Sequence, residues 1–192
     1  RQMCIRDRDT TIKDVAKDEL ATKANEQKAL IAQTADATTE EKEQANQQVD
    51  AQLTQGNQNI ENAQSIDDVN TAKDNAIQAI DPIQASTDVK TNARAELLTE
   101  MQNKITEILN NNETTNEEKG NDIGPVRAAY EEGLNNINAA TTTADVTTAK
   151  DTAVQKVQQL HANPVKKPAG KKELDQAAAD KKTQIEPVSY TH

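Results

Sequence analysis

Few side chains in this sequence could act as an acid, a base, a nucleophile or a soft metal ligand. The chain has two histidines and one cysteine. Cys4 and His192 lie near the two ends, so His161 has no second histidine or cysteine with which to complete a zinc site. Because His161 follows a stretch of helical character, we expect its imidazole to complement the negative end of a helix dipole, not to catalyse a reaction.

Carboxylates are abundant, but their spacing fits neither a metal loop nor a catalytic pair. Segment 110–122, NNNETTNEEKGND, lacks the alternating acidic ligands and the terminal glutamate of a calcium loop. The carboxylates of Glu40, Glu41, Glu117 and Glu118 are better explained as first-turn groups that stabilise helix starts. G-x-S-x-G and G-x-x-x-x-G-K motifs are absent. We therefore predict no catalytic, cofactor or metal site, and a protein that is not an enzyme.

The composition predicts helices with a small aliphatic core. Hydrophobic residues make up 34% and aromatic residues 1%, without Phe or Trp, so a core must consist of Ala, Val, Ile and Leu. A unit of about 70 residues built in this way is marginally stable alone. A net charge of -10 and a mean hydropathy of -0.90 also fit a disordered chain. The many strong helix formers, with only five Gly and five Pro, favour helices instead.

The charge pattern limits the classes of partner. An acidic chain is unsuited to nucleic acid or to an anionic membrane, which bind clustered Lys and Arg. No apolar stretch approaches the roughly 20 residues that span a bilayer, so we expect no membrane insertion. The one basic run, KKPAGKK at 166–172, is interrupted by proline and is interpreted as a solvated linker.

Two terminal strings do not continue the pattern of the remaining chain. Residues 1–8, RQMCIRDR, and residues 188–192, VSYTH, resemble translated sequencing-adaptor read-through. We interpret both as non-native tails; native but irregular tails are the alternative. Without residues 1–8 the chain has no cysteine, so it forms no disulfide and no thiolate site.

The sequence repeats itself without gaps at a period of 77 residues. Segment 65–80, SIDDVNTAKDNAIQAI, recurs at 142–157 as TTADVTTAKDTAVQKV. A third copy then starts, in which Glu173, Leu174, Lys181 and Ile185 match Glu96, Leu97, Lys104 and Ile108. We predict repeat 1 at 9–87, repeat 2 at 88–165 and the first helix of repeat 3 at 166–187.

Each repeat is predicted to contain three amphipathic helices. The first covers about 88–109 in repeat 2, with an apolar stripe at Leu97, Met101, Ile105 and Ile108. The second opens at a capping box, Thr38 to Glu41 and Thr115 to Glu118, and the third at Ser65 to Asp68 and Thr142 to Asp145. Their stripes are Val49, Leu53, Gly56, Ile60 and Ala63, then Val69, Ala72, Ala76, Ile77 and Ile80. Such helices can bury their stripes only against each other, in an up-down-up bundle.

Three positions leave local alternatives open. Gly56 and its counterpart Gly133 indicate either a close approach of another element or inherited similarity between the copies. Pro125, after Gly124, should kink the second helix of repeat 2 or delay its start to about residue 125. Tyr130 takes the place of Leu53 and is expected in the core, not in ligand stacking.

The prolines mark the ends of the repeats. Pro82, Pro164 and Pro168 follow the third helices, where proline ends a helix at little cost. They argue against a continuous helix from one repeat into the next. The predicted fold class is therefore all-α, with tandem three-helix bundles whose main partners are neighbouring repeats of the same chain, in an elongated rod.

Several motifs together resemble a known repeat family. TTEEKEQANQQV, IDDVNTAKDNAIQAI and the NPVKKPA junction are similar to the domain of unknown function 1542, over residues 9–187. The resemblance implies a tandem module of wall-anchored surface proteins in staphylococci and related Gram-positive bacteria. It also implies a link to cell aggregation, biofilm formation and methicillin resistance, with adhesion located in a separate region. No binding or catalytic residue carries over from it.

Two functions from different classes follow from these observations. The first is a non-catalytic stalk that projects an adhesive region from the cell wall. The second is a helical binding module, either for a host serum protein or for like repeats on other cells; it would need an exposed apolar or aromatic patch.

Overall fold

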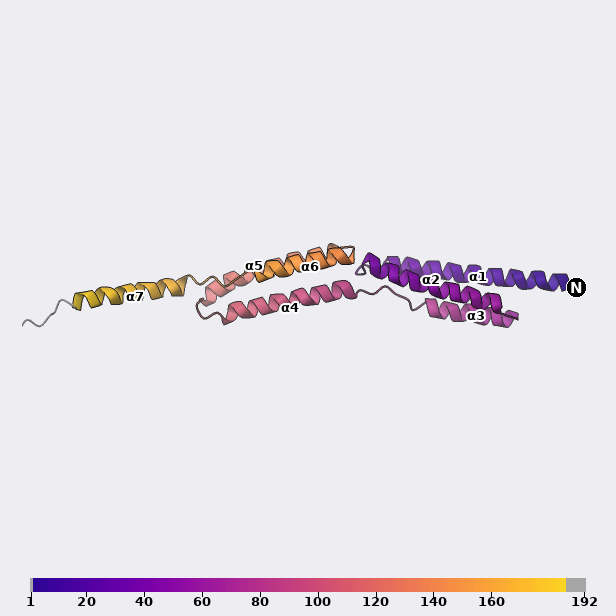
Figure 1. Ribbon diagram of the computed structural model, residues 1–192, viewed down its shortest axis with the longest axis horizontal. Helices are drawn as coiled ribbons and strands as arrows, with labels where there is room; N and C mark the ends of the chain where they lie inside the picture. The colour runs from indigo at the N-terminus through magenta and orange to yellow at the C-terminus, as the bar shows by residue number, and fades with distance from the viewer. Residues whose placement is uncertain (1, 186–192) are drawn as a thin grey trace, which may run out of the picture. The chain divides into compact units, whose positions relative to one another are not determined.

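The computed structural model describes the backbone of residues 2–185 and the side chains of residues 10–185. Within these residues the chain forms seven helices and no strand, so the all-α prediction is confirmed. The helices are α1 (Gln2–Ala32), α2 (Thr39–Asn62), α3 (Ile66–Ile80), α4 (Asp88–Asn110), α5 (Asn116–Ala139), α6 (Thr143–Gln158) and α7 (Lys166–Ile185) (Figure 1). The predicted tail 188–192 lies outside the described residues, whereas the backbone of residues 2–8 continues α1.

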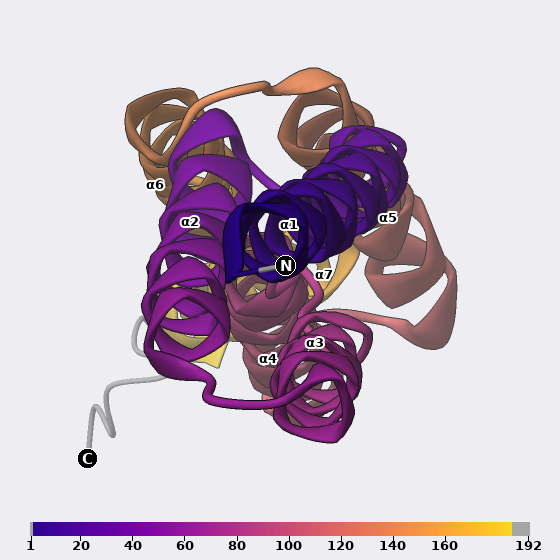
Figure 2. The ribbon, with the colours of Figure 1, turned by 90° about the vertical axis from the view of Figure 1, so that its right-hand side faces the viewer.

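The chain divides into two compact units. The first contains residues up to 92 together with 140–146, and the second contains residues 93–139 together with those from 147 onward. In the first unit α1, α2 and α3 pack against one another around a common centre (Figure 2). This is the predicted three-helix bundle.

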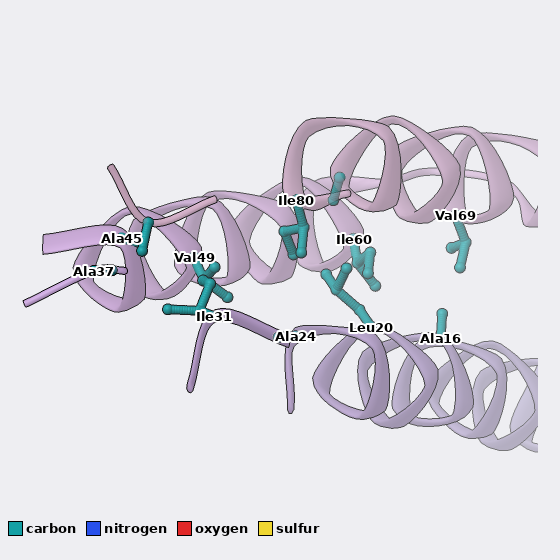
Figure 3. Packing of buried hydrophobic residues seen from close by; sticks show 12 residues of the cluster. Ala16, Leu20, Ala24, Ile31, Ala37, Ala45, Val49, Ile60, Val69 and Ile80 are labelled. Carbon is teal, nitrogen blue, oxygen red and sulfur yellow. The ribbon is translucent and has the colours of Figure 1, made fainter. Parts of the chain in front are cut away.

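The core of the first unit is aliphatic throughout. Leu20 and Ile31 from α1, Val49 and Ile60 from α2 and Ile80 from α3 are fully buried and point toward one another (Figure 3). These residues recur at helical spacing along each sequence segment, so one face of each helix carries them. Alanines 16, 24, 45 and 76 fill the remaining contacts and are buried to within 7% exposure.

The second unit repeats this packing with its own residues. Leu97 and Ile108 of α4, Val126 and Ile137 of α5 and Val157 of α6 are fully buried. An ion pair between the first and third helices recurs at the same register: Lys73 Nζ lies 2.5 Å from Glu19, and Lys150 Nζ lies 2.8 Å from Glu96. Tyr130 is half-buried, as is its counterpart Leu53.

The two glycines at the helix seam mark close helix contacts, as one of the two alternatives predicted. A Cβ placed on Gly56 would lie 2.6 Å from Ala76 Cβ and 2.6 Å from Leu20 Cδ2. Gly133 meets the equivalent pair, Ala153 and Leu97. No side chain fits at this position without moving its neighbours, so glycine is required where the three helices come together.

Of the two alternatives predicted for Pro125, a delayed helix start is excluded, because α5 begins at Asn116 and continues through Pro125. The capping box at Thr115 fixes the start nine residues before the proline. The basic run 166–172 is not a linker, because it forms the first turns of α7; its lysines are nevertheless solvent-exposed, as expected.

Non-helical segments separate the repeats. Residues 81–87 follow α3 and residues 159–165 follow α6, so no helix continues from one repeat into the next. Pro82 and Pro164 lie in these segments, whereas Pro168 lies in the first turn of α7, where its missing N–H is tolerated. In the described part of the chain, no helix is both long and apolar enough to cross a membrane.

α7 has the sequence of a first helix but not the surroundings of one. Its Leu174 is 70% exposed and Ile185 is 67% exposed, whereas the matching Leu97 and Ile108 of α4 are fully buried. The difference lies in the second and third helices, which cover α4 but have no counterparts beside α7 among the described residues.

Candidate functional site

Polar side chains concentrate at the start of the second helix of each repeat. We call residues 38–42 and 115–119, with the pattern T-x-E-E-K, the helix-start corners. At the first corner Thr38 Oγ1 accepts the Glu41 N–H at 3.3 Å, and Glu41 Oε2 accepts the Thr38 N–H at 2.8 Å. The two residues form a reciprocal capping box, as predicted.

The second corner has the same geometry. Glu118 Oε2 accepts the Thr115 N–H at 2.7 Å, and Thr115 Oγ1 accepts the Glu118 N–H at 3.3 Å. The Thr115 hydroxyl also donates to Glu118 Oε2 at 3.0 Å, as the Thr38 hydroxyl does to Glu41 at the same distance. The corner is thus a recurring feature of the repeat.

The second oxygen of each capping glutamate binds another helix. Glu41 Oε1 accepts the N–H of Val89, in the first turn of α4, at 3.1 Å. Glu118 Oε1 accepts the N–H groups of Val165 and Lys166, at the start of α7, at 3.0 and 2.7 Å. One carboxylate therefore satisfies backbone donors at the start of two helices, one in its own repeat and one in the next.

The corner lysine binds the end of the first helix. Lys42 Nζ donates to the carbonyl oxygen of Ala32, the last residue of α1, at 2.9 Å. Lys119 Nζ donates in the same way to Leu109 near the end of α4, at 2.6 Å. A cation at this place complements the negative end of the helix dipole. The T-x-E-E-K pattern thus ties together three helix ends.

The first unit also holds contacts between the first corner and residues 140–146. The Thr39 N–H donates to the Thr141 carbonyl at 2.9 Å, and Glu40 Oε2 accepts the Thr143 N–H at 2.9 Å. Thr143 is the first residue of α6, so Glu40 caps this helix as Glu41 caps α4. Thr38 is fully buried here, whereas its counterpart Thr115 is half-buried.

These hydrogen bonds stabilise the ionised carboxylates. Hydrogen bonds from the backbone N–H groups of Thr115, which has the larger effect, and of Lys166 lower the pKa of the Glu118 carboxyl from about 4.5 to about 2. The Thr143 N–H lowers the pKa of Glu40. For Glu41, burial opposes ionisation, but the N–H groups of Thr38 and Val89 outweigh it, and the pKa is lowered. Glu40, Glu41 and Glu118 therefore stay ionised to a lower pH than a glutamate in the unfolded chain.

The second recurring motif, D-V-x-x-A-K, holds the third helix in place. Ser65 Oγ accepts the Asp68 N–H at 3.1 Å, as Thr142 Oγ1 accepts that of Asp145. The motif valines, Val69 and Val146, are buried. The motif lysines, Lys73 and Lys150, form the ion pairs to the first helix described above.

The residues considered for chemistry do not come together. His161 is exposed in segment 159–165, three residues after the end of α6. Among the described side chains, no group of three or more His, Cys, Asp or Glu is arranged to hold a metal ion. The residues that do converge are the carboxylates and lysine of the helix-start corner.

Sequence reasoning found the capping role of Glu41 and Glu118 but missed their second role. The distant N–H donor lies 48 residues further along the chain in both cases, Val89 for Glu41 and Lys166 for Glu118. A helical period cannot reveal a contact at that separation. The identical recurrence of E-E-K in both repeats, where one carboxylate would suffice for capping, was the available signal.

Comparison with protein families identifies the repeat. Two successive segments, residues 12–88 and 89–165, match the model of the Domain of Unknown Function (DUF1542). The chain belongs to the DUF1542 family. The boundary between the two DUF1542 matches falls between Asp88 and Val89, so the Glu41–Val89 hydrogen bond joins a residue of one match to the first residue of the next. No curated protein and no solved structure is significantly similar to the chain.

Proposed function

We propose that these DUF1542 repeats are a non-catalytic structural spacer, which forms part of the stalk of a bacterial cell-surface adhesin. The observation that carries this proposal is the recurrence of one hydrogen-bonded link. Glu41 accepts an N–H from the start of α4 through its Oε1, and Glu118 accepts an N–H from the start of α7 through its own Oε1.

A hydrogen bond between a capping carboxylate and the backbone suits a spacer, because it does not depend on a particular side chain in the next helix. The acceptor is fixed by its own capping box, and the donors are the N–H groups that every helix start presents. Each added repeat can therefore make the same link, and the length of the array grows with the number of copies. An elongated rod is part of this proposal.

The location and wider role in this proposal rest on the family resemblance. A wall-anchored surface protein would use the repeats to hold an adhesive region away from the cell wall. Cell aggregation, biofilm formation and methicillin resistance would then be properties of the whole protein, to which the repeats contribute reach. The acidic surface, with 32 Asp and Glu against 22 Lys and Arg, favours an extended and soluble array.

Small-angle scattering tests the proposal on the full chain and on chains extended by one and by two copies of residues 12–88. We expect the maximum dimension to rise by nearly equal steps, at an ionic strength that screens repulsion between repeats. A radius of gyration that grows only weakly with copy number would contradict a stalk. Stoichiometric retention of one serum protein by the full chain would instead identify a binding module.

A further inference from the structure

The first repeat carries a groove at the end opposite its helix-start corner. A hollow of about 190 Å³ lies between α1 and the start of α3. It is lined by Ile12 and Lys13 of α1, by residues 63–65, and by Ile66 and Val69 of α3. We call these residues the acceptor groove. Ser65 and Ile66 at its rim are exposed, and Ile66 is 50% exposed.

The second repeat has equivalent positions at the same register, and there they bind a helix-start corner. An offset of 77 residues converts Ile12, Lys13, Gln64, Ile66 and Val69 into Val89, Lys90, Thr141, Thr143 and Val146. In the first unit Val89, Thr141 and Thr143 make the hydrogen bonds to residues 39–41. Lys90 is only 3% exposed there, whereas Lys13 is half-buried.

We propose that the acceptor groove binds the helix-start corner of a further DUF1542 repeat joined in tandem ahead of Ile12. This inference rests on the proposed stalk function and identifies a surface through which one repeat is attached to another.

The chemistry of the groove suits this partner. In the observed contact with the first corner, the residues equivalent to the groove bind mainly through backbone groups. These are the Thr141 carbonyl and the N–H groups of Thr143 and Val89. Gln64 and Ile66 keep the backbone carbonyl and N–H of Thr141 and Thr143, and the Ile12 N–H matches that of Val89 when a helix starts at this point, as it does in a tandem array. Lys13, whose Nζ donates to the Glu61 carbonyl at 2.7 Å, places a cation at the groove, which favours an acidic partner. The bonds of the Thr143 hydroxyl, to Glu40 Oε2 and with the Thr38 hydroxyl, have no counterpart at Ile66.

A second molecule is a poorer partner than a tandem repeat. The corner at residues 115–119 already binds the start of its own α7, with Glu118 accepting the Lys166 N–H at 2.7 Å. Docking of that corner on another molecule would place α1 of that molecule where α7 begins. In addition, Ile12 lies inside α1 of this chain, whereas Val89 is the second residue of α4.

The test inserts a further copy of residues 12–88 between Thr11 and Ile12 of the full chain, which keeps the register and places segment 81–88 before Ile12. Hydrogen exchange of the original Ile66 amide is the readout. We expect its exchange to slow by about two- to tenfold relative to the unextended chain, the effect of one ordinary hydrogen bond. Thr38→Ala with Glu40→Gln in the inserted copy should abolish the protection. Glu43→Ala, an exposed change on the same helix, should preserve it.

Ile66→Pro gives an independent readout. Ile66 is the first residue of α3, where proline is well tolerated, so the variant should fold while losing the N–H. It should leave the melting temperature of the unextended chain unchanged and lower that of the extended chain. Equal exchange of Ile66 in both chains would overturn the proposal, as would protection that depends on protein concentration and so identifies a second molecule. Small-angle scattering on the same chains tests the stalk function separately. If Ile66 is unprotected but the extended chain still lengthens, only the proposed binding in the acceptor groove is overturned.

Discussion

Glu118 accepts the N–H of Lys166 at 2.7 Å, although Lys166 lies directly after the segment 89–165 that matches DUF1542. The same carboxylate closes the capping box of α5. The start of one repeat is therefore bonded to the group that holds the second helix of the previous repeat, and the two helix starts depend on a single charge.

This dependence predicts an acid-sensitive link. The folded-state pKa of Glu118 is about 2, below the value of about 4.3 expected in the unfolded chain. The unfolded state therefore binds the proton more readily, so the stability from Glu118 is complete above about pH 4.3 and is lost as the pH falls toward 2. Glu118→Gln should lower the urea midpoint at pH 7 and lose this difference near pH 2.

Glu173→Gln provides the matched control for the acid-sensitive link. Glu173 is an exposed glutamate in α7, and its replacement should leave the urea midpoint within error at pH 7. If Glu118→Gln behaves as Glu173→Gln does at pH 7, the carboxylate does not stabilise the junction.

Glycine at the helix seam gives a second prediction. Gly56→Ala would place a methyl group 2.6 Å from Ala76 Cβ, and such overpacking costs about 1–3 kcal/mol. The gain in helix propensity is about 1 kcal/mol, so the free energy of unfolding should fall. Gly133→Ala should behave in the same way. Chemical denaturation followed by circular dichroism measures both variants.

Gly120→Ala is the control, because it has the propensity gain without the clash. A Cβ on Gly120 would meet no described heavy atom within 4 Å outside its own helix segment. This variant should stabilise the chain by about 0.5–1 kcal/mol. Stabilisation of similar size by Gly56→Ala would show that the three helices do not meet as closely as this packing requires.

Local and periodic features of the fold could be predicted from the sequence, whereas distant contacts could not. The stripes around Leu97 and Val49 and the capping boxes at Thr38 and Thr115 predicted the helices because each depends on residues within one or two turns. The cap at Thr115 determines the start of α5, so Pro125 does not delay it. The interpretation of the basic run 166–172 as a linker is wrong because Glu118, far away in sequence, supplies the cap for α7. The corner glutamates also cap a helix of the following segment, as Glu118 caps α7. This contact depends on the tertiary fold, which brings that helix start next to the corner, and no local sequence pattern predicts it.

The corner lysine provides a third prediction. Lys42→Met keeps the length of the side chain but removes the bond to the Ala32 carbonyl. A cation at a helix end contributes about 0.3–1 kcal/mol, and the free energy of unfolding should fall by that amount. The loss should shrink at high salt, because the interaction is electrostatic. Lys172→Met, an exposed change in α7, should have an effect within about 0.5 kcal/mol, and a similar loss in both variants would refute the capping role.

Helix α7 gives a prediction about packing, because leucines at one register are buried in α1 and α4 but exposed in α7. Leu20 and Leu97 are fully buried in their bundles, whereas Leu174, at the same register in α7, is 70% exposed. Truncation of a buried leucine removes packed methyl groups and leaves a cavity, so Leu20→Ala and Leu97→Ala should each cost about 2–5 kcal/mol. Leu174→Ala should change the free energy of unfolding by less than about 0.5 kcal/mol. Urea denaturation of the three variants measures these differences. A large loss for Leu174→Ala would mean that α7 is covered in solution, and equal small losses at all three positions would mean that the bundles do not use these leucines as their core.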